Sequence, residues 1–158
     1  AGGNLAITML LTLRDSGDAL PAAAACLSPV TDLTPQDDRC KAIRDPLLPP
    51  KAMRLYSRSY VGHADARDPL ISPVYGDLRG LPPLLVHVGE DEILRDDAER
   101  LANLAQSAGV DVCLQVYARM WHVWQLFLAL PQATQSLDQI GEFLHSHMGP
   151  RARPTSPA

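Results

Sequence analysis

Short apolar runs alternate with longer amphipathic segments along this chain, and this alternation constrains the fold more than any other feature. Strands are predicted where apolar residues run together or alternate with polar ones, at 22–27, 84–88 and 111–117. Helices are predicted where apolar residues recur at helical spacing, at 2–15, 51–61, 94–108 and 131–147. Strands that alternate with helices are typical of an α/β fold with a parallel sheet and right-handed crossovers.

Three strands are few for a parallel sheet, which must be covered on both faces and usually contains more strands. We therefore expect the sheet of this chain to be incomplete. The first residue is not Met, which fits a truncated start.

The bulk composition restricts the class of protein. The chain has 158 residues, of which 46% are hydrophobic and 20% charged, as in one ordinary domain or part of one. A net charge of −4 without a basic block disfavours nucleic acid and anionic membranes as partners. No apolar run reaches the ~18 residues of a membrane-spanning helix, and no signal peptide opens the chain. We expect a cytoplasmic protein.

Cysteine usage gives no sign of a metal site or a disulfide framework. The three cysteines, Cys26, Cys40 and Cys113, are an odd number without CxxC spacing. Cys26 and Cys113 lie in apolar runs and are expected to be small core residues. We predict no metal site.

Chemically useful side chains follow two of the predicted strands. Asp91 and Glu92 come after the strand that ends at Val88, and His122 comes after the strand 111–117. Open parallel sheets place their sites at the carboxyl ends of their strands. Taken singly, His122 could be a structural histidine between two tryptophans, and Glu92 a solvated or helix-capping carboxylate.

Five segments, in this order, resemble the bacterial hormone-sensitive-lipase-like esterases, a branch of the α/β-hydrolases. They are AGGNLA at 1–6, LSPVTDL at 27–33, DPLISP through DLRGLPP at 68–83, VGEDEILRDD at 88–97 and MWHVW at 120–124. The resemblance covers residues 1 to about 148. It implies a partial α/β-hydrolase fold made of the C-terminal parallel strands with flanking helices, followed by a disordered tail at 149–158.

The resemblance also implies roles for individual residues. In this family the nucleophilic serine comes first, the acid second and the histidine last. The acid maps to Glu92, with Asp91 as the alternative, and the base maps to His122. The serine would lie immediately before Ala1, whose backbone N–H would be an oxyanion donor. Trp121 and Trp124 are predicted either to line the ester pocket or simply to pack.

The implied activity is hydrolysis of small apolar carboxylic esters through an acyl-enzyme, without a cofactor. The expected partners are a small-molecule ester and the missing N-terminal half of the same domain, with homo-oligomerisation possible. Without the serine, this chain alone is expected to be inactive. Two alternatives stay open: a non-catalytic ligand-binding protein with the same fold, which would not need His122, and a nonfunctional fragment.

Overall fold

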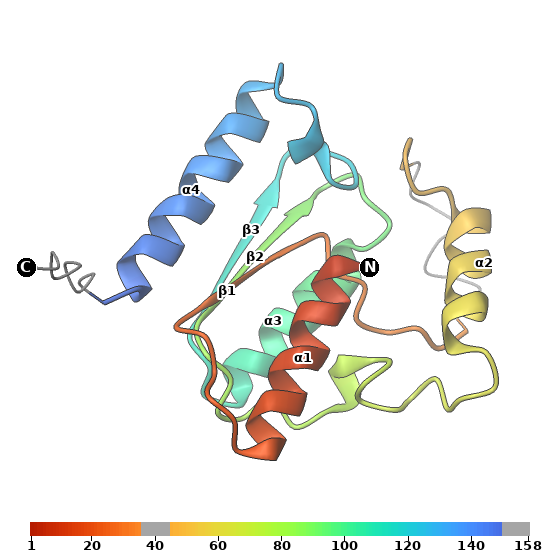
Figure 1. Cartoon of the computed structure of the whole chain (residues 1–158). Helices are drawn as coiled ribbons and strands as arrows, with labels where there is room; N and C mark the ends of the chain where they lie inside the picture. Colours follow the sequence, from red (N-terminus) through yellow and green to blue (C-terminus); the bar gives the residue numbers. More distant parts are fainter. Residues whose placement is uncertain (36–44, 150–158) are drawn as a thin grey trace, which may run out of the picture.

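The computed structural model of the chain describes residues 1–35 and 45–149. Its strands form a parallel sheet in the order β1 (Ala24–Leu27), β2 (Leu84–Gly89), β3 (Val112–Tyr117). Its α-helices are α1 (Gly2–Ser16), α2 (Pro50–Val61), α3 (Arg95–Ser107) and α4 (Pro131–His147). Two short 3-10 helices, η1 (Pro73–Tyr75) and η2 (Trp124–Leu126), complete the described elements (Figure 1). The predicted α/β fold class is confirmed.

The element ends follow from local chemistry. Helix α1 stops where Gly17 adopts a left-handed conformation, with φ at 73°. Gly109, with φ at 83°, follows α3 in the same way. Helix α4 starts at Pro131, a residue suited to the first helical position because it has no N–H to leave unpaired. These signals explain why the predicted ends lie within two residues of the observed ones.

The main core lies between one face of the sheet and helices α1 and α3. Leu84, Val86 and Val88 of β2 project alternately to this face and are buried against both helices. The helices contribute Ile7, Leu10, Leu11, Ala98, Leu101 and Ala105. Burying this apolar surface is the main stabilising term for the described part of the chain.

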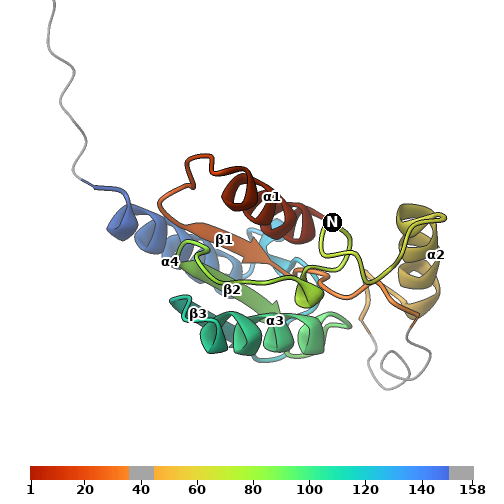
Figure 2. The ribbon, with the colours of Figure 1, turned by 90° about the horizontal axis from the view of Figure 1, so that it is seen from below.

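Helix α4 covers the opposite face of the sheet, so that the strands form a layer between helices (Figures 1 and 2). A smaller cluster, with Tyr117, Met120, Trp124 and Ala133 at its centre, fills this side. His87 of β2 also points here, where its Nδ1 lies 2.8 Å from Ser136 Oγ of α4. A buried polar pair therefore links the sheet to its last helix.

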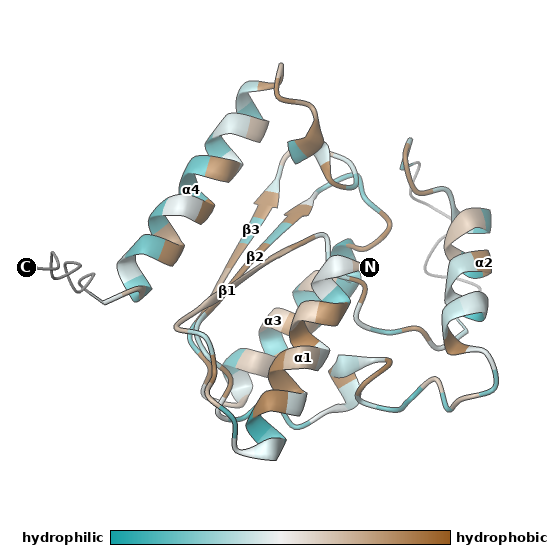
Figure 3. Cartoon of the chain, viewed as in Figure 1, coloured by the Kyte–Doolittle hydropathy of each residue, from teal (hydrophilic) through white to brown (hydrophobic). Residues whose placement is uncertain are grey.

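Helix α1 turns a different face to the core than its sequence suggests. Leu5 and Met9, which recur four residues apart as expected for the buried stripe of a helix, are 52% and 63% exposed. The buried face carries Asn4, Ile7, Thr8, Leu10 and Leu11. Asn4 is held there by two hydrogen bonds from its side-chain amide to the carbonyls of Val30 and Ile71, 3.0 and 2.9 Å long. Figure 3 shows that apolar positions are spread along α1.

Helix α2 stands apart from the sheet in both views of the molecule (Figures 1 and 2). None of its residues is buried, although Met53 and Val61 pack against a small cluster with Leu33 and Ile93. Within the described ranges, no helix is long and apolar enough to cross a bilayer.

Of the two cysteines predicted to lie in the core, one is buried and the other is exposed. Cys26 is buried, as predicted, and burial raises the pKa of its thiol to about 12. Cys113 was also expected in the core but is exposed on the outer strand β3. Cys40 and the predicted disordered residues 150–158 lie outside the described residues.

Candidate functional site

The loops after β2 and β3 are joined to each other at the carboxyl end of the sheet. The backbone N–H of Glu90 donates to the Tyr117 carbonyl, and that of Asp91 donates to the Met120 carbonyl, each at 2.9 Å. Gly89 makes this approach possible, because a Cβ on it would lie 2.2 Å from the Met120 carbonyl oxygen. The strand ends thus fix the acidic loop against the histidine loop.

Glu92 is fully buried, with 0% exposure, although its side chain is a carboxylate. Its Oε2 accepts a hydrogen bond of 2.7 Å from the Ser28 hydroxyl and one of 3.1 Å from the Gly89 backbone N–H. Its Oε1 has no hydrogen-bond partner among the described residues. A buried carboxylate is stable only when its oxygens are satisfied, so one oxygen of Glu92 is left for a further partner.

His122 is the group that faces this free oxygen. Its Nδ1 lies 3.9 Å from Glu92 Oε1, and this nitrogen likewise lacks a hydrogen-bond partner among the described residues. A hydrogen bond between an acid and a base requires a separation of about 2.6–3.2 Å, so the bond expected between Glu92 and His122 from the resemblance is not formed in this structure. The two atoms nevertheless lie within ion-pair distance of each other, and both are buried.

Asp91, the alternative acid, lies elsewhere. Its side chain is exposed, and its backbone N–H is used by the Met120 carbonyl. Of the two adjacent carboxylates, Glu92 is the one that the fold turns inward toward His122.

Two further residues hold the site together, and neither was predicted as a site residue from the sequence. Ser28 lies directly after β1, and its hydroxyl contacts Glu92 and the backbone N–H of Val123. Asp45 is buried, and its Oδ2 accepts long hydrogen bonds from the N–H groups of Ile93 and His122, at 3.4 and 3.3 Å. The position of Ser28 at a strand end was a usable signal, whereas nothing in the irregular segment around Asp45 marked that residue.

The backbone around the site is strained at three positions. Ser28, Arg119 and Val123 have left-handed conformations, with φ at 45°, 58° and 47°. Such values are uncommon outside glycine, and for a β-branched residue such as Val123 they are outliers. Backbone strain of this kind concentrates at functional sites.

Ala1 lies at the start of α1, at the end of that helix nearest the carboxyl ends of the strands (Figure 1). Its nitrogen is the chain terminus, and burial lowers the pKa of this amine. Close packing of α1 depends on Gly3, where a Cβ would lie 2.8 Å from the Cα of Pro29. The start of α1 and the loop after β1 are therefore pressed together beside Ser28.

The two tryptophans beside His122 have different surroundings. Trp124 is fully buried and packs against the Tyr117 ring, with a centroid separation of 4.8 Å. It belongs to the buried cluster between the sheet and α4. Trp121 is half-buried, and its ring meets that of Phe127 edge-on at 5.7 Å.

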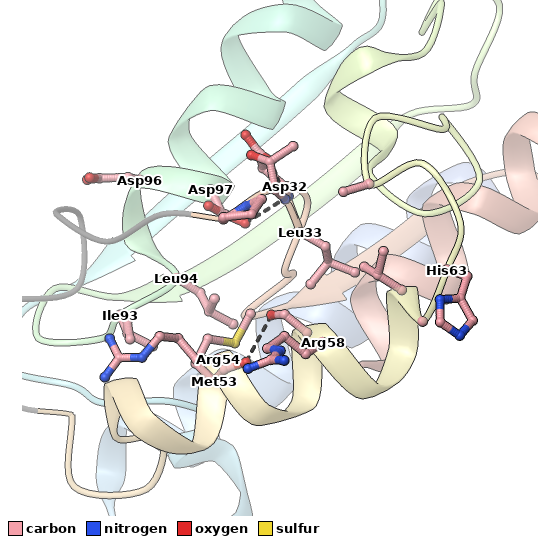
Figure 4. Close-up of a pocket in the computed structure, with 16 residues that line it drawn as sticks. Asp32, Leu33, Met53, Arg54, Arg58, His63, Ile93, Leu94, Asp96 and Asp97 are labelled. Carbon is pink, nitrogen blue, oxygen red and sulfur yellow. Dashed lines mark hydrogen bonds between the residues drawn. The ribbon is translucent and has the colours of Figure 1, made fainter.

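A cavity of about 670 Å³ lies between α2, the loop after β1 and the start of α3 (Figure 4). Ile93 and Leu94, which directly follow Glu92, form part of its wall. Apolar side chains of Leu33, Met53 and Val61 line it together with charged ones such as Arg54 and Arg58. Its volume is in the range of small-molecule sites.

Comparison with known proteins places the chain among hydrolases. A family model described as an alpha/beta hydrolase fold matches residues 1–126. An acetyl-hydrolase of Streptomyces hygroscopicus is 40% identical over 152 residues, which cover 94% of this chain and 51% of that protein.

Solved structures agree with this placement. The crystal structure of EstE5 soaked with ethyl alcohol is 39% identical, with a TM-score of 0.89, over 93% of this chain and 51% of that one. An esterase from the bacterial hormone-sensitive lipase family is 42% identical, with a TM-score of 0.85, over 94% and 51% of the two chains. The chain thus spans about half the length of the relatives it matches.

Proposed function

We infer the function from the premise that this chain belongs to the α/β-hydrolase family, in its branch of bacterial hormone-sensitive-lipase-like esterases, and propose that it supplies the acid and the base of a carboxylic-ester hydrolase. The upstream half of the same domain would supply the serine nucleophile. The observation that carries the proposal is the buried Glu92 carboxylate with one unsatisfied oxygen turned toward Nδ1 of His122.

The chemistry assigns a separate task to each group. His122 takes the proton of the serine hydroxyl as that oxygen attacks the ester carbonyl, and then gives it to the departing alkoxide. Water next attacks the acyl-enzyme and gives a proton to His122, which passes that proton to the departing serine oxygen as the carboxylic acid is released. Glu92 keeps the imidazole proton on Nδ1 and stabilises the imidazolium formed in each step. The backbone N–H of Ala1 would become an oxyanion donor once a residue precedes it.

Small, apolar esters are the substrates that we propose. The cavity beside Ile93 and Leu94 offers an apolar wall of the right size for a short acyl or alcohol group, and the Streptomyces relative is named an acetyl-hydrolase. Trp121, next to His122, is proposed to line the ester pocket on the histidine side. Cytoplasmic location and homo-oligomerisation stay predictions.

The test uses the chain with an upstream half in place, a protein we call the complete enzyme. That half is the chain's own, read from its coding sequence, or else the corresponding half of the Streptomyces acetyl-hydrolase joined before Ala1. We expect turnover of p-nitrophenyl acetate at about 1 per second or faster. The variant His122→Ala should reduce kcat by about 10³-fold or more, while residues 1–158 alone should be inactive.

Two outcomes would contradict the proposal. A complete enzyme that folds but hydrolyses no ester would favour a binding protein. Esterase turnover by residues 1–158 alone would mean that another residue is the nucleophile.

A further inference from the structure

Ser28 is a buried polar residue that contacts both Glu92 and the histidine loop. Its side chain is almost fully buried, at 1% exposure. It comes directly after the last residue of β1, and its backbone N–H donates to the His87 carbonyl of β2 at 2.8 Å. The residue is thus attached to the sheet, while its hydroxyl projects toward the site.

The two oxygens of Glu92 differ only because of their partners. Ser28 Oγ and the Gly89 N–H both bind Oε2, at 2.7 and 3.1 Å, while Oε1 remains open toward His122. A carboxylate can rotate to exchange its oxygens unless its partners fix one orientation. The Gly89 N–H is a single donor at the base of the side chain, so the hydroxyl of Ser28 is the second point that fixes the carboxylate plane.

The same hydroxyl reaches the histidine loop. It has one proton, which goes to Glu92, and its lone pair accepts the N–H of Val123 at 3.3 Å. Val123 directly follows His122. Ser28 and Val123 both have the rare left-handed conformation, so two strained residues meet through this bond. Strain of this kind persists only where surrounding contacts impose it.

We propose that Ser28 is a positioning residue that fixes the acid–base pair from both sides: it holds Oε2 of Glu92 so that Oε1 faces His122, and it anchors the backbone of the histidine loop. The proposal rests on the proposed function, because it assigns Ser28 a role in that same site. Ser28 does not contact the ester. It acts through Glu92 and His122, and its loss should lower kcat and leave KM nearly unchanged.

Three variants of the complete enzyme separate the hydroxyl from the backbone. Ser28→Ala removes the hydroxyl, Ser28→Gly removes it and also accommodates the left-handed backbone without strain, and Ser28→Thr retains it. The matched control is Ser72→Ala. Ser72 is also fully buried and also binds a loop N–H, that of Leu33 at 2.8 Å, but it does not contact Glu92.

We expect Ser28→Ala and Ser28→Gly to lower kcat for p-nitrophenyl acetate by about 10–100-fold. Their KM should change by less than about 3-fold, because ground-state binding does not use this hydroxyl. Ser28→Thr should recover part of kcat even if the strained backbone lowers its Tm. Ser72→Ala should lower Tm while kcat stays within about 3-fold of the parent value.

A second measurement reports on positioning without turnover. In protein labelled with ¹⁵N-histidine, the ring-nitrogen chemical shifts of His122 show which nitrogen carries the proton when the ring is neutral. We expect the proton on Nδ1 in the parent and a mixture of both tautomers in Ser28→Ala and Ser28→Gly.

The two proposals can fail separately. If the unmodified complete enzyme hydrolyses no ester, the proposed function fails, and the tautomer measurement still decides the role of Ser28. If Ser28→Ala and Ser28→Gly keep the parent kcat and the parent tautomer, the role of Ser28 is refuted. Losses of activity that match those of Ser72→Ala at equal loss of Tm would refute it as well.

Discussion

At the scale of single residues, Glu92 and Asp91 are adjacent carboxylates with opposite burial in the fold. One is fully buried between Ser28 and His122, and the other is exposed. We propose that this difference in environment, and not the residue type, makes Glu92 the acid.

Exchange of each carboxylate for its amide should therefore have unequal effects. In the complete enzyme, Glu92→Gln should lower kcat by about 10²–10⁴-fold, because a neutral amide neither stabilises the imidazolium nor fixes its tautomer. Asp91→Asn, the matched control, should stay within about 3-fold of the parent. Steady-state kinetics on p-nitrophenyl acetate give both values. The reverse order of effects would assign the acid to Asp91.

His87 makes a second prediction at this scale, which concerns stability. Burial lowers its pKa to about 4, from an ordinary value near 6.5. Between these two values the unfolded chain binds a proton that the native protein does not, so the free energy of unfolding falls as the pH falls through this window. The free energy of unfolding falls by at most about 3 kcal/mol across this window, and none of it is lost above about pH 6.5.

Urea unfolding of the complete enzyme at a series of pH values measures this slope. His87→Gln should flatten it, because the amide does not titrate. His63→Gln, at an exposed position, should leave it unchanged. An unaltered slope in His87→Gln would show that other groups cause the loss.

Contacts between individual residues could be predicted from the sequence only where a local pattern marked both partners. The closeness of Glu92 and His122 could be predicted because each follows a recognisable strand, and parallel strands bring such positions together. Ser28 also follows a strand, but its partners Glu92 and Val123 are 64 and 95 residues away. No local pattern reports contacts of that range, and the same holds for Asp45.

At the scale of elements, the order and type of helices and strands were predictable, whereas the buried face of α1 was not. Caps and turns such as Gly17 and Pro131 mark the ends locally. Helix α1 has leucines or other apolar residues on most of its circumference, so periodicity did not distinguish the side with Ile7 from the side with Met9. The packing of the loops around Asn4 makes that choice.

The join between the acidic and histidine loops gives a prediction at this scale. Gly89→Ala would place a Cβ 2.2 Å from the Met120 carbonyl, against backbone that has little room to move. We expect a loss of about 1–3 kcal/mol in the free energy of unfolding and a fall in kcat, because the loops must separate. Urea unfolding and kinetics of the complete enzyme measure both effects.

Gly141→Ala is the control for this substitution. Gly141 lies inside α4 with open space around it, so alanine should stabilise the helix by up to about 1 kcal/mol without changing kcat. A Gly89→Ala variant as stable as Gly141→Ala would show that the two loops can part without cost.

At the scale of the whole molecule, the described sheet has an open side. Strand β1 is an edge strand in the order β1-β2-β3, and the neighbouring α1 exposes Leu5 and Met9. In a soluble monomer such edges and apolar surfaces are usually covered. The relatives are about twice as long as this chain. We propose that a segment corresponding to their additional half packs on β1 and on the exposed face of α1.

Residues 1–148 on their own should consequently associate or aggregate, while the complete enzyme should be well behaved. Size-exclusion chromatography with thermal melting compares the two proteins at equal concentration. Replacing Leu5 and Met9 by serine should reduce the association of the short form. A monodisperse, cooperatively melting short form would show that the chain is a complete domain.

Backbone hydrogen bonds join the two loops at the carboxyl end of the sheet, and these loops carry Glu92 and His122. Helix α2, in contrast, buries none of its residues, and its side chains line one wall of the cavity. We therefore expect substitutions in α2 to be tolerated more readily than substitutions in the joined loops. Evolution of this protein should change its preference among esters through substitutions in α2 while it keeps the same reaction.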